Sequence, residues 1–121
     1  MLAKYAEQGI EVFTEIRIRV SASRFRIPDI CVTLGDPGEE ILTRPPLLCI
    51  EILSPEDRMA RVETRVRDFL DMGVPYVRLL NPATRQAHVG RPGQPLMEIE
   101  DDILRTENPA IEMPLAGLWV S

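Results

Sequence analysis

The sequence predicts an α/β domain with a mixed β-sheet flanked by helices. An alternating segment near the N-terminus, an apolar run that stops at a Ser-Pro pair, and a helical stripe after it support this fold class. Together they give the order helix, three strands, helix, strand. The chain has 121 residues, 45% of them hydrophobic, which suits one compact domain over residues 1–121.

The first half of the chain is expected to supply three strands. Residues 2–8 favour a short helix, and residues 10–20 alternate apolar and charged side chains as a half-buried strand does. Residues 21–26 are expected to turn, and a second strand spans 27–34, whose early proline suits a strand start. The nearly continuous apolar run at 47–53 is typical of a central strand covered on both faces.

A helix is expected from Ser54 to Met72. Ser54 would be its N-cap, Pro55 would follow in the first turn, and Gly73 would end it. Its buried stripe would consist of Met59, Val62, Val66, Phe69 and Leu70. The remaining elements are predicted as strands over 74–82, 86–89 and 96–99 and a turn or short helix over 114–119.

Composition excludes several classes of protein. A net charge of -5 argues against a protein that coats nucleic acid by bulk electrostatics. Cys31 and Cys49, with His88 as the single histidine, are too few for a disulfide framework or a zinc site, so buried reduced thiols are expected. His88 is expected on the surface. The sequence has no apolar run of about 20 residues and no signal peptide, which predicts a cytoplasmic location.

Glu51 stands inside the apolar run, where a charge costs several kcal/mol unless it is paired or bound to a metal. If the strands that carry Asp29 and Glu51 are antiparallel neighbours, pairing these residues also pairs Cys31 with Cys49, because both steps are of two residues. Facing carboxylates repel unless a cation lies between them. Ligation by oxygen atoms alone favours magnesium or manganese over zinc.

Simpler interpretations of these residues remain open. Asp29 could cap a turn after its proline, and Glu15 could be a solvated strand residue. Glu51 could form a buried ion pair with Arg65 or Arg58 and bind no metal. Three arginines near one margin of the helical stripe could pair with local acids: Arg58, Arg61 and Arg65.

Three segments, RIPDICV, PPLLCIEILSPEDR and GVPYVRLLNP, resemble the Uma2 family of endonucleases, a branch of the PD-(D/E)XK superfamily. The resemblance extends from about Val12 to the C-terminal LAGLW. Pro28 and Asp29 resemble the proline-aspartate motif, and Glu51 resembles the acidic residue of the (D/E)XK motif. The resemblance implies a restriction-endonuclease-like fold.

The same resemblance implies a magnesium- or manganese-dependent endonuclease that hydrolyses phosphodiester bonds. Asp29, Glu51 and the backbone carbonyl of Ile52 would hold the metal. Glu15 matches an upstream acidic position that could supply a further metal or water contact. The implied partner is nucleic acid, with DNA favoured over RNA, and related nucleases often form homodimers.

The sequence departs from the family pattern at the motif's lysine. The expected position is Leu53, and the helix position where the family carries its lysine aligns with Arg65. An arginine can hold a phosphate or a water, but its guanidinium stays protonated and cannot act as a general base. The sequence therefore supports a nuclease weakened at Arg65, or a degenerate nuclease-fold domain that acts as a binding or dimerisation module.

Overall fold

The computed structural model describes residues 9–99, 103–107 and 110–114. Its centre is a six-stranded sheet in the order β1-β4-β6-β7-β8-β9, in which β6 and β7 run parallel and the other neighbours run antiparallel. These strands are β1 (Ile10–Phe13), β4 (Ile30–Leu34), β6 (Leu48–Ile52), β7 (Tyr76–Asn81), β8 (Gln86–Gly90) and β9 (Met97–Ile99). The mixed sheet predicted from the sequence is confirmed.

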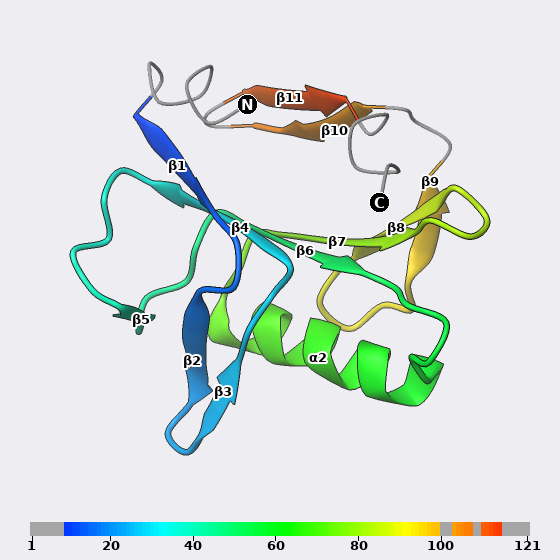
Figure 1. Ribbon diagram of the computed structural model, residues 1–121, viewed down its shortest axis with the longest axis horizontal. Helices are drawn as coiled ribbons and strands as arrows, with labels where there is room; N and C mark the ends of the chain where they lie inside the picture. The colour runs from blue at the N-terminus through cyan, green and yellow to red at the C-terminus, as the bar shows by residue number, and fades with distance from the viewer. Residues whose placement is uncertain (1–8, 100–102, 108–109, 115–121) are drawn as a thin grey trace.

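Two smaller sheets accompany the central one. The first has the order β3-β2-β5 and consists of β2 (Arg17–Ser21), β3 (Arg24–Arg26) and β5 (Ile41–Leu42). The second is the hairpin of β10 (Ile103–Thr106) and β11 (Ile111–Pro114). In Figure 1 the helix α2 (Met59–Met72) lies below the central sheet and the hairpin lies above it.

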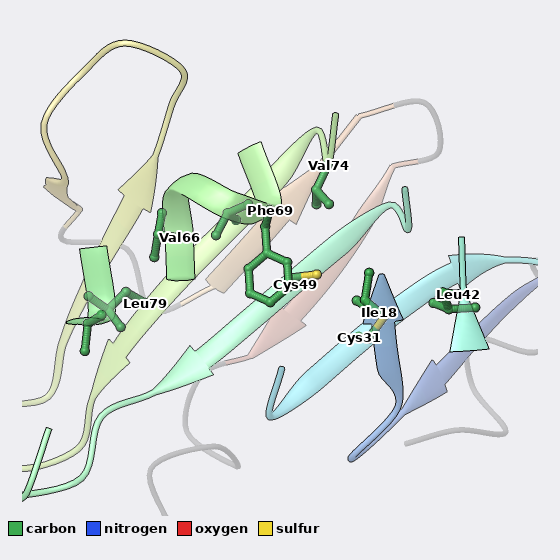
Figure 2. Packing of buried hydrophobic residues seen from close by; sticks show 10 residues of the cluster. Ile18, Cys31, Leu42, Cys49, Val66, Phe69, Val74 and Leu79 are labelled. Carbon is green, nitrogen blue, oxygen red and sulfur yellow. The ribbon is translucent and has the colours of Figure 1, made fainter. Parts of the chain in front are cut away.

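Apolar side chains pack on both faces of the central sheet. Figure 2 shows the helix side, where Phe69 points from α2 toward β6. The buried residues of this cluster are Ile18, Cys31, Leu42, Cys49, Val62, Val66, Phe69, Val74, Val77 and Leu79. On the other face, Leu48 and Ile50 of β6 share a cluster with Leu104 and Ile111 of the hairpin. The central strand β6 is therefore covered on both faces, as its apolar run predicts.

The helix ends where the sequence predicts but begins later. Gly73 has φ 104° and donates its N–H to the Leu70 carbonyl at 3.0 Å, which is a left-handed C-cap. The predicted start at Ser54 is wrong, because α2 begins at Met59 and has no side-chain N-cap. The Ser54 N–H instead donates to Asp57 Oδ2 at 2.8 Å, so this acid closes a separate turn before the helix.

The helix lies close to the sheet at Gly90. A Cβ at this position would lie 2.7 Å from Val66 Cγ1, so a larger residue in β8 would push α2 away. None of the helical structure in the described residues is long and apolar enough to span a membrane.

The long strand predicted over 10–20 is wrong, because this segment forms β1 and β2 in two different sheets. The break is at Glu15, whose φ of 60° is rare for a residue with a side chain and turns the chain out of the central sheet. The turn predicted over 21–26 contains β3, which pairs with β2. The helix predicted over 2–8 lies outside the described residues, and so does the element predicted over 114–119 beyond Pro114.

Candidate active site

The register between β4 and β6 brings Asp29 toward Glu51. Cys31 pairs with Cys49 and Ile30 with Ile50, so one further step places Asp29 opposite Glu51 at the end of the ladder. Asp29 is exposed, and its Oδ2 accepts a hydrogen bond from the Ile52 N–H at 2.6 Å. The predicted cross-strand pairing of the cysteines is confirmed.

Glu51 is a buried carboxyl group with 4% of its surface exposed. Burial raises the pKa of Glu51 to about 7, and the guanidinium of Arg65 opposes this shift. The charge of Asp29 and a side-chain hydrogen bond with it raise the pKa of Glu51 further. Negative charge on both carboxyl groups is therefore unfavourable, and a proton or a cation between them is favoured.

Arg65 reaches this place from the middle of α2. Its Nε lies 3.7 Å from Glu51 Oε1, and Nη2 lies 3.5 Å from Asp57 Oδ1. Both distances exceed the usual length of a charge-assisted hydrogen bond, about 2.7–2.9 Å. Glu51 Oε1 and Arg65 Nε are buried, and neither has a hydrogen-bond partner among the described residues. The ion pair considered from the sequence is present, but it leaves these two polar atoms unsatisfied.

Asp57, which lies within the helix expected from Ser54 to Met72, is also a member of this cluster. Hydrogen bonds from Ser54, the backbone N–H first, lower the pKa of Asp57 and keep it charged beside Arg65. An aspartate three residues after Ser54 can close a turn as well as begin a helix. This spacing is the sequence signal that indicates the position of Asp57.

Of the other sequence-predicted residues, the described structure joins only Ile52 to the cluster. Glu15 lies on the exposed turn between β1 and β2, not on a strand, and no hydrogen bond or ion pair joins it to Asp29 or Glu51 in the described structure. Arg58 and Arg61 are exposed near the start of α2. Ile52 contributes its N–H to Asp29, while its carbonyl remains a predicted ligand.

The residues present fit a magnesium or manganese site that is completed by other ligands. No group of three His, Cys, Asp or Glu side chains that could hold a metal occurs in the part of the chain that the structure describes. Magnesium, however, is commonly held by one or two carboxylates together with water and substrate phosphate. The unsatisfied Oε1 of Glu51, next to the Asp29 carboxylate, suits such a partial site.

His88 is less exposed than the sequence predicts. It lies in β8 opposite Leu79 and Glu98, so its side chain is on the helix side of the sheet. The residue is half-buried, and its Nδ1 is buried without a hydrogen-bond partner in the part of the chain that the structure describes. The expected surface position is therefore wrong, because the sheet continues through β9 and β8 is not an edge strand.

Comparisons with known proteins agree on the fold. The family model described as "Uma2: Putative restriction endonuclease" matches residues 1–121. A crystal structure of a putative nuclease belonging to DUF820, from Anabaena variabilis, has a TM-score of 0.73 at 23% identity and covers 98% of this chain and 72% of that one. A search of curated proteins gives no match. The predicted restriction-endonuclease-like fold class is confirmed.

Proposed function

The chain belongs to the Uma2 family, and on this premise we propose that it is a metal-dependent nuclease acting on DNA, with its active site at Asp29 and Glu51. The observation that carries the proposal is the pair of unsatisfied buried atoms, Glu51 Oε1 and Arg65 Nε. A buried polar atom without a partner costs about 1–3 kcal/mol, so its presence points to a partner that the described residues do not supply.

The roles proposed for the residues follow from their charges. Asp29, Glu51 and the Ile52 carbonyl would hold magnesium or manganese. The chemistry that such an ion supplies when bound is polarisation of the phosphodiester and a lower pKa of water. Arg65 would orient a phosphate oxygen or a water through its N–H groups, since its guanidinium cannot take up a proton near neutral pH. A contact from Glu15 remains a prediction.

A second candidate is a degenerate site whose domain acts as a binding or dimerisation module. Arg65 favours it, because this arginine stands where the family carries a lysine and already contacts both Glu51 and Asp57. The two candidates share the fold and differ in whether manganese supports cleavage. A homodimer remains a prediction for either candidate, and sedimentation of the purified protein measures it.

The test is cleavage of labelled DNA in manganese and in EDTA. The nuclease proposal expects slow cleavage in manganese that disappears in EDTA and in the Glu51→Gln variant. Glu63→Gln is the matched control, since it makes the same change on an exposed position of α2 and should cleave like the parent. Cleavage that is equal in Glu51→Gln would contradict the assignment, and no cleavage under any metal would favour the degenerate candidate.

A further inference from the structure

The sheet β3-β2-β5 has an inner and an outer face. Ile18 of β2 is fully buried in the helix-side cluster, so the residues beside it in the strand point to the other face. The register places Arg19 opposite Phe25 and Arg17 opposite Ile41. We call the side away from α2 the outer face. It consists of Arg17, Arg19, Phe25 and Ile41, and Ile27 follows directly after β3.

The apolar side chains at the outer face are open to solvent. Phe25, Ile27 and Ile41 are 47%, 52% and 37% exposed. They make up half of the exposed large apolar side chains in the described residues, where the others are Leu34, Met59 and Met97. Large apolar side chains gathered on one exposed face indicate a binding surface, whereas single ones need no explanation.

The two arginines of the outer face differ from those of the inner side. Arg26 Nε donates to Asp68 Oδ2 at 2.8 Å, and Arg24 lies 3.5 Å from the same carboxylate, so Asp68 holds β3 against α2. Arg17 and Arg19 form no ion pair within the described structure. Arg19 Nε and Nη2 donate to the Ala22 carbonyl at 3.2 and 2.6 Å, which fixes its guanidinium at the hairpin turn. Its remaining N–H groups are open to an anion.

The outer face borders the candidate active site. Ile27 precedes Asp29 by two residues, which limits the separation of their Cα atoms to roughly 7 Å. A chain bound along the outer face would thus extend toward Asp29 and Glu51. Figure 1 shows β2 and β3 projecting beside α2.

We propose that the outer face binds an unpaired strand of the nucleic acid on which the proposed nuclease acts, so this inference rests on the proposed function. Arg17 and Arg19 contact phosphates, and Phe25 stacks on a base, with Ile27 and Ile41 beside it. Charged grooves with exposed aromatic rings are the usual means of holding single strands. In a duplex the base faces are stacked on one another, so Phe25 would meet no base.

A second copy of this chain fits the face less well. A two-fold interface sets one patch against itself, which would bring the arginines of the two copies together. The residues that make up the outer face include no acid, and like charges in an interface are costly. Charge complementarity therefore favours an anionic partner.

The test is fluorescence anisotropy with a 5′-labelled oligo(dT) strand of 20 nucleotides and the matching duplex, both in EDTA so that cleavage does not interfere. Arg17→Gln and Phe25→Ala should each weaken binding of the single strand by about tenfold. Arg17→Gln should also make the slope of log affinity against log salt concentration shallower, by the amount expected for the loss of about one phosphate contact. The control is Arg67→Gln, which removes the same charge from an exposed position of α2 and should bind within twofold of the parent.

Three results would overturn the proposal. If the parent binds and cleaves nucleic acid while both variants bind equally well, the face is wrong and the nuclease function stands. If the duplex binds as tightly as the single strand and Phe25→Ala has no effect, the face does not select an unpaired strand. If Phe25→Ala converts a dimer into a monomer in sedimentation without changing affinity, a second copy covers the face. A parent that binds neither probe and cleaves neither would remove this proposal and the nuclease function together.

Discussion

The strands β4 and β6 bring two pairs of side chains together by one register, and the two pairs differ in what they do. Cys31 and Cys49 are fully buried, and they pack with the apolar residues under α2. Asp29 and Glu51 each lie two residues from one of these cysteines, at the end of the ladder. They place one exposed and one buried carboxyl group side by side.

Sheet geometry is the same for both pairs, so the side chains alone determine the outcome. The thiols are small apolar groups that cost nothing to bury, and they help to fix the register. The carboxyl groups are held in place by that register at a cost to stability, because Glu51 is charged only with difficulty. We infer that the cysteine pair supports the fold and that the carboxylate pair is kept for function.

The largest expected effect concerns the cysteine pair. A hydrogen bond with Cys31, and then burial, raise the pKa of the Cys49 thiol, so little thiolate is present for reaction. Labelling with a thiol reagent should be at least about a thousandfold slower in the folded protein than in denaturant, because it requires opening of the core. Rapid labelling of both cysteines in the native protein would contradict the burial of this pair.

The carboxylate pair should show its cost as a dependence of stability on pH. The pKa of Glu51 is raised from 4.5 to about 7, so the folded state binds this proton more tightly than the unfolded state does. The stabilising contribution of protonated Glu51 to the free energy of unfolding is therefore complete below pH 4.5. It is lost as the pH rises through 7. In EDTA at pH 8.5, Glu51→Gln should be more stable than the parent by up to about 3 kcal/mol.

Urea unfolding at several pH values measures this difference, which should shrink toward pH 4.5. The matched control is Glu63→Gln, which makes the same change at an exposed position of α2. If the stability difference between Glu51→Gln and the parent does not change with pH, burial does not raise the pKa of Glu51.

Arg65 tests whether the carboxylate pair still supports catalysis. Arg65→Lys should raise manganese-dependent cleavage by about ten- to a hundredfold, because a lysine can exchange a proton where an arginine cannot. Arg65→Ala should reduce cleavage to background, since it removes the charge that faces the phosphate. The double variant Arg65→Lys with Glu51→Gln should be inactive, which controls for a contaminating nuclease.

Two results would count against this role. A parent that is already fast and indifferent to Arg65→Ala would show that the residue is misassigned. An inactive Arg65→Lys variant that still binds metal would show that the site has degenerated beyond one residue.

The elements around the carboxylate pair were predictable from local patterns. The equal steps from Asp29 to Cys31 and from Glu51 to Cys49 determine the register, because side chains alternate with a period of two in any strand. Gly73 marked the end of α2 for an equally local reason, its left-handed conformation.

The failures lie where tertiary structure overrides a local pattern. Alternation continues on both sides of Glu15, so nothing in the pattern of residues 10–20 reveals that the chain changes sheets there. The strands β5, β10 and β11 are short and were not predicted, since each is stabilised by its partner more than by its own sequence. The ion pair of Arg65 with Asp57 was missed because it depends on where α2 begins.

Calorimetry with manganese tests the central claim most directly, since the claim is that Asp29 and Glu51 hold a divalent metal together. The parent should bind manganese with a dissociation constant on the order of 0.1 to 1 mM, as expected for a site completed by substrate. Asp29→Asn should weaken binding at least about tenfold, because it removes one of two charged ligands. Asp71→Asn, the same change on an exposed position of α2, should leave the heats unchanged. Equal heats for the parent and Asp29→Asn, or no heat from either, would contradict the account and leave the binding-module candidate ahead.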